Sequence, residues 1–288
     1  MKKHLFILFF LIVPIITWGN ESILNVSDIK LDIADVINKS DIAPTIVGED
    51  DREEITNENA KDLEKAVVVL GHSYDDEIHA SCSGAMVGPN VVLTAAHCLV
   101  QNGKYKKDIE VFAVAADKSE STPSLSAKSI ELYIPKEYIE LSRESLDSLA
   151  REYDYGVVVL DKPIGLETGW FKLNAKSNPR LKKIITMGYS GDKPDNTLWR
   201  SEGRTGFVVY DNNTFKHNAD TLLGNSGSPI VMKKRPDEII GIHISHLTQA
   251  GDYAPNGYPN TGLRITKDII DLVTKYNKRN GPYLTSKD

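Results

Sequence analysis

Short Val- and Ile-rich stretches, separated by turn residues, recur along most of the chain. Several short strands at close spacing, with no long helical period between them, predict an all-β antiparallel sandwich or barrel. One segment differs: in residues 266–276, apolar side chains recur at helical spacing on one face, so we expect a single C-terminal α-helix. The stretches that we expect to be strands are 66–71, 86–93 with an interruption at Gly88-Pro89-Asn90, 109–113, 155–160, 184–189, 206–210 and 239–244.

Composition and charge exclude several classes of protein. The 288 residues are 41% hydrophobic and 26% charged, which is ordinary for a globular protein and unlike a disordered, collagenous or coiled-coil chain. The formal net charge of −6 leaves no basic field that could hold nucleic acid or anionic lipid. We therefore expect a monomer with no nucleic-acid partner and no cofactor. The polar residues 115–150, which include a Ser-rich stretch, predict a long surface excursion.

The N-terminal segment has the three parts of a secretory signal peptide. Lys2 and Lys3 precede an apolar run over 5–17, and the small-residue site Thr17-Trp18-Gly19 follows. The run is shorter than the roughly 20 residues that span a bilayer. We expect a signal peptide over 1–19, a pro-segment over 20–45 and a secreted mature protein, extracellular or periplasmic, with no membrane attachment.

Three short motifs carry the candidate chemistry. They are Thr-Ala-Ala-His-Cys at 94–98, Tyr-Asp-Tyr-Gly-Val at 153–157 and Gly-Asn-Ser-Gly-Ser-Pro at 224–229. A serine hydroxyl is a weak nucleophile, so acyl transfer needs a histidine to take its proton and a carboxylate to orient the imidazole. His97, Asp154 and Ser226 supply these groups, and we expect them to be catalytic.

The glycines around Ser226 indicate a tight turn. Such a turn can aim the backbone N–H groups of Gly224 and Ser226 at a developing oxyanion, and the loss of one such donor typically costs about 3 kcal/mol of transition-state stabilisation. Gly224 has no Cβ to obstruct that approach. We therefore expect Gly224 and Ser226 to form an oxyanion hole.

Other interpretations of the same residues are weaker. Asp161 follows the 155–160 strand and could replace Asp154, but Lys162-Pro163 after it indicates a strand-ending turn. A zinc site built on His79, Cys82, His97 and Cys98 has the wrong spacing, so no metal is expected. An α/β-hydrolase would need Gly-x-Ser-x-Gly and the order Ser, Asp, His, and this chain has neither.

With these motifs in this order, the chain resembles the chymotrypsin-like serine peptidases. The resemblance implies two antiparallel six-stranded β-barrels, which we place at 46–170 and 171–288, with the triad in the cleft between them. His97 would be the general base and acid, Asp154 its orienting carboxylate and Ser226 the nucleophile. The resemblance also implies that the two cysteines of the chain, Cys82 and Cys98, form a disulfide.

A narrower resemblance is to the bacterial glutamyl endopeptidases. It rests on Gly-Tyr-Ser-Gly-Asp-Lys-Pro at 188–194, on Leu198-Trp199 and the Ser-Glu-Gly that follows, and on Asp51-Arg52 with Ile-Thr shortly after. The resemblance implies that Thr221 and His243 bind the carboxylate of a substrate glutamate. It also implies that the mature terminus, near Thr45 or Ile46, approaches the specificity pocket. Histidines 72, 79 and 217 are interpreted as ordinary surface or core residues.

Asp220 leaves the specificity open. It stands six residues before Ser226, where trypsin-like enzymes carry the aspartate that selects Arg or Lys, and a bare carboxylate would repel a substrate glutamate. Asn225 replaces the aspartate that pairs with a new N-terminal amine in trypsin-type activation. We hypothesise a secreted serine endopeptidase that cleaves peptides or proteins after Glu or Asp. The alternatives are Arg/Lys specificity through Asp220, or a catalytically silent binding protein.

Overall fold

The computed structural model describes residues 46–56, 58–61, 63–74, 77–101, 104–113, 125–143, 147–209, 213–245 and 257–279. The chain divides into Met1–Asp41 and Ile42–Asp288, and every described residue belongs to the second unit. The expected signal peptide and pro-segment therefore lie outside the described residues.

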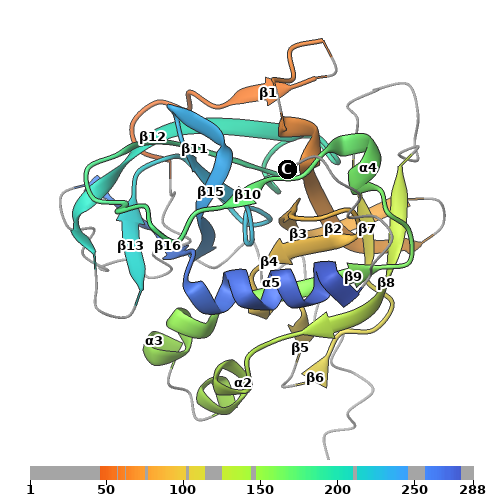
Figure 1. The fold of residues 1–288 in the computed structure, drawn as a ribbon. Helices are drawn as coiled ribbons and strands as arrows, with labels where there is room; N and C mark the ends of the chain where they lie inside the picture. The colour runs from red at the N-terminus through yellow and green to blue at the C-terminus, as the bar shows by residue number, and fades with distance from the viewer. Residues whose placement is uncertain are drawn as a thin grey trace, which may run out of the picture. The chain divides into compact units, whose positions relative to one another are not determined.

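The first half of the second unit is a closed six-stranded antiparallel barrel (Figure 1). Its strands follow the order β2-β3-β4-β9-β8-β7 around the barrel. Every residue of β4 and β9 is buried, which explains why these two strands are nearly pure runs of Val and Leu. The strands are β2 (Val67–Tyr74), β3 (Glu77–Met86), β4 (Val91–Thr94), β7 (Glu110–Phe112), β8 (Ser126–Tyr133) and β9 (Gly156–Leu160).

The expectation of a surface excursion over 115–150 is wrong for β8. This strand pairs with both β7 and β9, and most of its side chains are only partly buried. Because only Ala127 is fully buried, the strand lacks the apolar pattern that marked the others. Two short helices follow it and lead toward Asp154: α2 (Lys136–Arg143) and α3 (Asp147–Ala150).

The second half forms another closed antiparallel barrel. Its sheet has the order β1-β12-β11-β14-β15-β16-β13, and a pairing between β12 and β13 closes the six strands from β11 to β16. Strand β10 joins the edge of β15 in parallel. The strands are β1 (Glu53–Ile55), β10 (Lys172–Leu173), β11 (Lys183–Gly188), β12 (Leu198–Val209), β13 (Thr214–His217), β14 (Pro229–Met232), β15 (Arg235–Ser245) and β16 (Asn260–Arg264).

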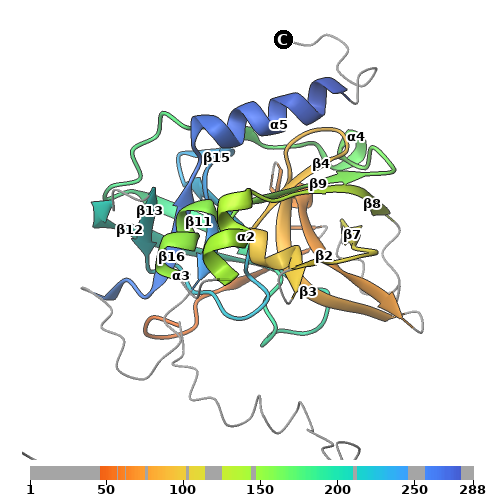
Figure 2. The ribbon, with the colours of Figure 1, turned by 90° about the horizontal axis from the view of Figure 1, so that it is seen from below.

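The C-terminal helix, α5 (Lys267–Arg279), runs along one side of the two barrels (Figures 1 and 2). Its apolar face buries Ile269, Val273 and Tyr276. The Asn277 side-chain amide donates to the Val87 carbonyl at 3.0 Å, so a helix that follows the second barrel packs against the first. The smaller elements include β5 (Val100–Gln101), β6 (Lys104–Tyr105), α4 (Gly165–Thr168) and 3-10 helices at Glu64–Ala66, Ala96–Cys98 and Arg151–Tyr153.

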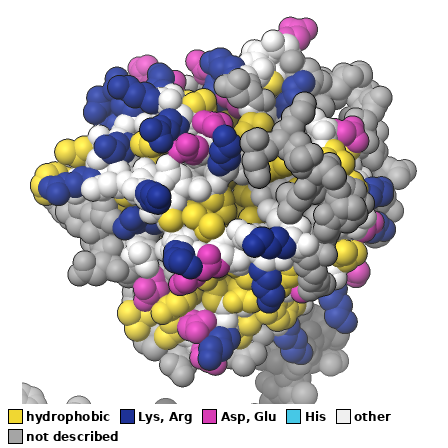
Figure 3. All heavy atoms as spheres, in the orientation of Figure 1, with side chains coloured by type: hydrophobic (Ala, Val, Ile, Leu, Met, Phe, Trp, Pro, Cys, Tyr) yellow, Lys and Arg dark blue, Asp and Glu magenta, His cyan; other side chains and the backbone are white. Residues whose placement is uncertain are grey.

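The prediction of two six-stranded antiparallel barrels with a C-terminal helix is confirmed. The boundary at 170/171 remains a prediction, and β1, on its N-terminal side, pairs with β12 of the second barrel. Among the described residues, no helix is long and apolar enough to cross a membrane. On the face in Figure 3, acidic and basic side chains are interspersed with apolar ones.

Candidate active site

His97 lies in a short 3-10 helix that directly follows the buried strand β4. The residues on either side, Ala96 and Cys98, are buried, whereas 34% of the His97 side chain is exposed. A disulfide joins Cys98 to Cys82 on β3, as the resemblance implied. The imidazole is thus held at the surface by a turn that is anchored on both sides.

Asp154 lies between a 3-10 turn and β9, and it is buried. One carboxylate oxygen, Oδ2, is 2.8 Å from His97 Nδ1, and the other accepts from the His97 backbone N–H at 3.0 Å. Burial by itself lowers the pKa of His97, but the charge and hydrogen bond of Asp154 outweigh it, so the pKa is raised. The paired carboxylate therefore favours an imidazolium at position 97.

Asp161 does not take part in this pair. It lies beyond the opposite end of β9, where its Oδ1 accepts from the Lys128 backbone N–H at 2.8 Å. Of the two carboxylates considered from the sequence, the structure brings Asp154 to His97.

Ser226 lies at the centre of a tight turn before β14. The Asn225 N–H donates to the Leu222 carbonyl at 3.1 Å, and the Ser228 N–H donates to the Asn225 carbonyl at 3.0 Å. Gly227 has φ +84°, and a Cβ there would lie 2.2 Å from the Ser83 carbonyl oxygen. Only glycine lets this turn approach the first barrel so closely.

The turn is bonded directly to the first barrel through Ser83 of β3. The Ser83 N–H donates to the Ser226 carbonyl at 2.8 Å, and the Ser83 hydroxyl donates to the Gly224 carbonyl at the same distance. The Ser226 carbonyl oxygen also lies 3.7 Å from Cys98 Sγ, next to His97. Ser226 therefore lies where the two barrels touch, beside the cysteine that follows His97 in the chain. The Ser226 hydroxyl makes no hydrogen bond with any described residue.

The backbone N–H groups of Gly224 and Ser226 have no acceptor among the described residues. The N–H groups of Asn225, Gly227 and Ser228, by contrast, each donate to a carbonyl. Gly224 has φ +94°, a conformation that glycine adopts without strain. The two free donors are the pair expected from the sequence to bind an oxyanion.

The predicted specificity residues, Thr221 and His243, are both buried. His243 lies on β15, where its backbone exchanges hydrogen bonds with the nucleophile turn: Gly227 N–H donates to its carbonyl at 2.8 Å, and its own N–H donates to Ser228 at 2.9 Å. His243 Nδ1 lies 3.2 Å from Nε2 of His217 on β13. Burial lowers the pKa of His217 to about 3, so this ring is neutral at neutral pH.

Asp220 is turned toward the N-terminal segment. Its Oδ1 accepts from the Val47 backbone N–H at 2.8 Å, and its own N–H donates to the Ser201 hydroxyl at 2.6 Å. Burial raises the pKa of its carboxyl, and the Val47 N–H offsets part of that effect. The cavity that Asp220 lines includes Val47, Asp51 and Glu202, but neither Thr221 nor His243.

Within the described residues, one group of potential metal ligands is close enough to share an ion: Cys82, His97 and Cys98. Both thiols are consumed in the disulfide, so they cannot bind a metal as thiolates. The group therefore offers no zinc site of the kind considered from the sequence.

Comparison with known proteins agrees with this geometry. A family model described as Trypsin matches residues 56–261, a range that contains His97, Asp154 and Ser226. The chain belongs to the trypsin family.

The known proteins to which this chain is similar have different printed names. A glutamyl endopeptidase of Bacillus licheniformis is 30% identical over 244 residues, which cover 81% of this chain and 69% of the relative. An extracellular metalloprotease of Bacillus subtilis is 27% identical, with coverages of 80% and 68%. A solved Glu endopeptidase in complex with MPD has a TM-score of 0.64 and 23% identity, and covers 81% of this chain and 99% of that one.

Two parts of the trypsin-family site were missed from the sequence. One is His217, interpreted as an ordinary histidine but paired with His243. The other is the buried guanidinium of Arg52, which donates to Asp50 Oδ1 at 2.8 Å, to Asp192 Oδ1 at 3.0 Å and to the Ser190 hydroxyl at 2.9 Å. These hydrogen bonds join the N-terminal segment to the loop beside the nucleophile turn.

Proposed function

We propose that this trypsin-family serine peptidase cleaves peptide bonds after glutamate, with His97, Asp154 and Ser226 as its catalytic triad. The observation that carries the proposal is the buried Asp154 carboxylate, 2.8 Å from His97 Nδ1, beside a serine turn that has two unclaimed N–H groups. A paired imidazole and a preformed oxyanion site are what acyl transfer requires.

In the acylation step, the Ser226 hydroxyl oxygen attacks the substrate carbonyl carbon while His97 Nε2 takes the hydroxyl proton. Asp154 stabilises the resulting imidazolium. The carbonyl oxygen becomes an oxyanion, which accepts hydrogen bonds from the N–H groups of Gly224 and Ser226. When the tetrahedral intermediate collapses, the C–N bond breaks and His97 gives its proton to the leaving amine.

Deacylation repeats the same proton transfers with water. His97 takes a proton from a water molecule whose oxygen attacks the ester carbon. The C–O bond to Ser226 then breaks, and His97 returns the proton to the serine oxygen. The product acid leaves with a new C-terminal carboxylate, and the enzyme regains its starting protonation state.

The preference for glutamate is assigned to Thr221 and His243. A carboxylate that enters a poorly hydrated pocket needs hydrogen-bond donors, which a threonine hydroxyl and an imidazole N–H can supply. One of the two facing ring nitrogens of His217 and His243 must carry a hydrogen, which couples the tautomers of the two rings. If the neutral His217 donates from Nε2 to His243 Nδ1, then His243 Nε2 carries the hydrogen that a substrate carboxylate can accept.

The alternative preference for Arg or Lys requires the Asp220 carboxylate to face the substrate. That carboxylate accepts a hydrogen bond from Val47 instead, which favours the acidic specificity. The 30% identical Bacillus licheniformis relative, named a glutamyl endopeptidase, supports the same choice.

The test is to offer purified mature protein a matched peptide series with Glu, Asp, Gln, Arg or Phe before the scissile bond. We expect kcat/KM to be highest for Glu, with Asp second. A preference for Arg would indicate that Asp220, rather than Thr221 and His243, determines the specificity. Ser226→Ala should lose turnover while its melting temperature stays close to that of the wild type. A well-folded wild-type protein that cleaves none of the series would instead support the protease-like binding protein.

We also propose that the protein is exported and that residues 1–45 are removed. The apolar run and small-residue site near Gly19 support export, although they lie outside the described residues. N-terminal sequencing of the protein recovered from the culture medium and the periplasm tests this. A terminus at Met1 in the cytoplasmic fraction would contradict it.

A further inference from the structure

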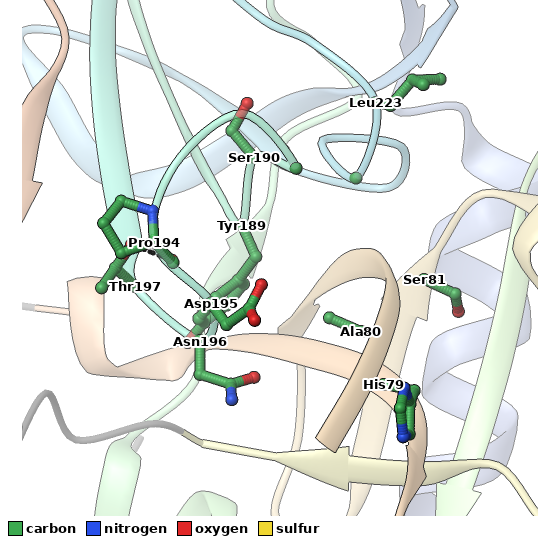
Figure 4. Close-up of a pocket in the computed structure, with 12 residues that line it drawn as sticks. His79, Ala80, Ser81, Tyr189, Ser190, Pro194, Asp195, Asn196, Thr197 and Leu223 are labelled. Atoms are coloured by element: carbon green, nitrogen blue, oxygen red, sulfur yellow. Dashed lines mark hydrogen bonds between the residues drawn. The ribbon is translucent and has the colours of Figure 1, made fainter. Parts of the chain in front are cut away.

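A groove of about 580 Å³ lies beside the nucleophile turn and has no part in glutamate binding as proposed above. Gly224 is one of its lining residues, and Leu223 lies on a different side of the groove from Ala80 and Ser81 of β3 (Figure 4). The third wall is the loop after β11, and it includes Asp195. The groove therefore borders a proposed oxyanion donor, and neither Thr221 nor His243 lines it.

This step rests on the proposed function: the part of the substrate after the scissile bond passes along this groove. In the proposed mechanism His97 protonates the leaving amine. The amine therefore departs on the side of His97 and of the neighbouring Cys82–Cys98 disulfide. Cys82 of that disulfide directly follows Ser81, at the rim of the groove. Over residues 77–82, β3 has a strand partner on one side only, β2, among the described strands. Its other edge is open to an extended peptide.

Asp195 places a negative charge in this groove that no described residue neutralises. Its side chain points toward β3 across the groove in Figure 4, and it makes no hydrogen bond or ion pair with any described residue. The other charged residues of the loop are engaged: Asp192 binds Arg52, and Lys193 Nζ lies 2.7 Å from Asp50 Oδ2. No described cation therefore neutralises the Asp195 carboxylate.

Two hydroxyl groups near Asp195 are used within the protein, whereas Asn196 Oδ1 is buried and has no hydrogen-bond partner among the described residues. The Thr197 hydroxyl donates to the Pro194 carbonyl and accepts from the Trp199 indole at 2.8 Å, and the Ser81 hydroxyl donates to the Leu70 carbonyl at 3.1 Å. An uncompensated carboxylate in a concave wall attracts a cationic side chain and repels an anionic one. On the opposite wall, the imidazole of His79 is the titratable group that faces the same space.

We propose that this groove is a subsite that selects Lys or Arg within the first three residues after the scissile bond, with Asp195 as its specificity-determining residue. The enzyme would then recognise an acidic residue before the bond and a basic residue after it. Substrates of this class carry opposite charges on the two sides of the cleavage point.

The experiment uses peptides with Glu before the scissile bond. The first, second and third positions after the bond are changed one at a time to Lys, Gln or Glu, with Ala elsewhere. An exposed ion pair contributes up to about 1 kcal/mol, so at one position kcat/KM should rise about three- to fivefold from Gln to Lys and fall by a similar factor from Gln to Glu. The preference should shrink when NaCl is raised from 50 mM to about 1 M.

Two variants assign the preference to its residue. Asp195→Asn should remove the difference between Lys and Glu, and Asp195→Lys should reverse it. Asp271→Asn on α5, a surface carboxylate paired with Lys267, is the matched control and should leave the preference unchanged.

The inference is overturned if the wild type shows no Lys, Gln, Glu order at any of the three positions, or if that order persists in Asp195→Asn. Cleavage of the Glu peptides without a charge preference would contradict only the proposed subsite. Absence of any cleavage would contradict both the proposed function and the subsite. Because the salt series needs only wild-type protein, the result does not depend on the folding of either variant.

Discussion

The protonation of His97 depends on one buried carboxylate, that of Asp154. Burial of the imidazole lowers its pKa, and the Asp154 charge and hydrogen bond raise it by more. A general base works only while it is neutral, so activity should be lost as the pH falls through this raised pKa. The acid limb of the rate profile should therefore lie above the pH expected for an ordinary histidine.

Asp154→Asn should change both the rate and the pH profile. Removal of the carboxylate should lower kcat on the order of 10⁴-fold, since an amide neither stabilises the imidazolium nor fixes the required tautomer. The midpoint of the acid limb should move to lower pH, because the group that raises the pKa of His97 is gone. Steady-state kinetics from pH 5 to 9 measure both effects. Asp161→Asn, beyond the other end of β9, is the control, and a similar loss there would contradict the assignment.

His217 should make stability depend on pH. Its folded pKa of about 3 lies below the 6.5 of an ordinary histidine, so between these values the unfolded chain binds the proton and the folded protein does not. The free energy of unfolding should therefore fall as pH falls from about 6.5 toward 3, with a contribution of about 1.4 kcal/mol per pH unit from this one residue.

Urea unfolding of the wild type and of His217→Gln at pH 4, 5, 6 and 7 tests that contribution. Glutamine does not titrate, so the slope of stability against pH should be shallower in the variant between pH 4 and 6. Parallel slopes in the two proteins would show that His217 is not buried in its neutral form.

At the scale of elements, the N-terminal segment is held against the second barrel by a buried guanidinium. The Arg52 side chain is only 2% exposed, and its carboxylate partners, Asp50 and Asp192, are each 35% exposed. The side-chain hydrogen bond from Arg52 is the largest influence on the pKa of Asp50 and lowers it. The loop that contains Asp192 also bonds to the nucleophile turn, where the Gly191 N–H donates to the Leu223 carbonyl at 2.7 Å.

Arg52→Gln should reduce both stability and activity. Breaking this pair leaves two carboxylates without their cation, and because both are partly solvated we expect a loss of about 2 kcal/mol. Because Arg52 lowers the pKa of Asp50, the pair stabilises the folded protein only while this carboxyl group is ionised. That stabilisation is lost as the pH falls below about 4, so the difference in stability between the variant and the wild type should narrow there. Thermal unfolding at pH 7 and pH 3 measures this. An equal loss at pH 7 in Arg180→Gln, an exposed cation stacked on Phe207, would argue against a specific clamp.

The elements differ in how far the sequence predicts them. Strands β4 and β9 are buried at every position, and their runs of Val therefore predicted strands from the sequence alone. Strands β13 and β16 were not predicted, because most of their residues have polar or small side chains. These strands form through pairing between distant parts of the chain, such as that of Phe215 with Gly262. The Arg52–Asp192 pair joins residues 140 positions apart, and no local pattern marks such a contact.

On the scale of the whole molecule, the candidate site exists only where the two barrels meet. Motif spacing predicted that His97, Asp154 and Ser226 act together, because each lies in a short segment with its own local signature. It did not predict Ser83, whose hydroxyl donates to the Gly224 carbonyl at 2.8 Å and accepts from the Tyr189 N–H at 2.9 Å. This hydroxyl joins β3 of the first barrel to two loops of the second.

Ser83→Ala should therefore weaken the contact between the barrels. The Gly224 carbonyl and Tyr189 N–H would lose a buried partner, at a cost of about 1–3 kcal/mol in the free energy of unfolding. Because Gly224 carries a proposed oxyanion donor, kcat should fall more than KM changes. Ser177→Ala is the matched control, since its hydroxyl bonds to Met232 within the second barrel. Equal effects of the two substitutions on kcat would contradict this role.

The most direct test of the central claim is covalent capture of the nucleophile. Peptidyl phosphonates that carry a glutamate or an arginine side chain beside the phosphorus are incubated with the mature protein, and the modified residue is located by mass spectrometry. The account predicts one adduct, on the Ser226 oxygen, that forms at least about tenfold faster with the glutamate probe and is absent from Ser226→Ala. An adduct on another residue, no adduct with folded protein, or faster capture by the arginine probe would contradict it.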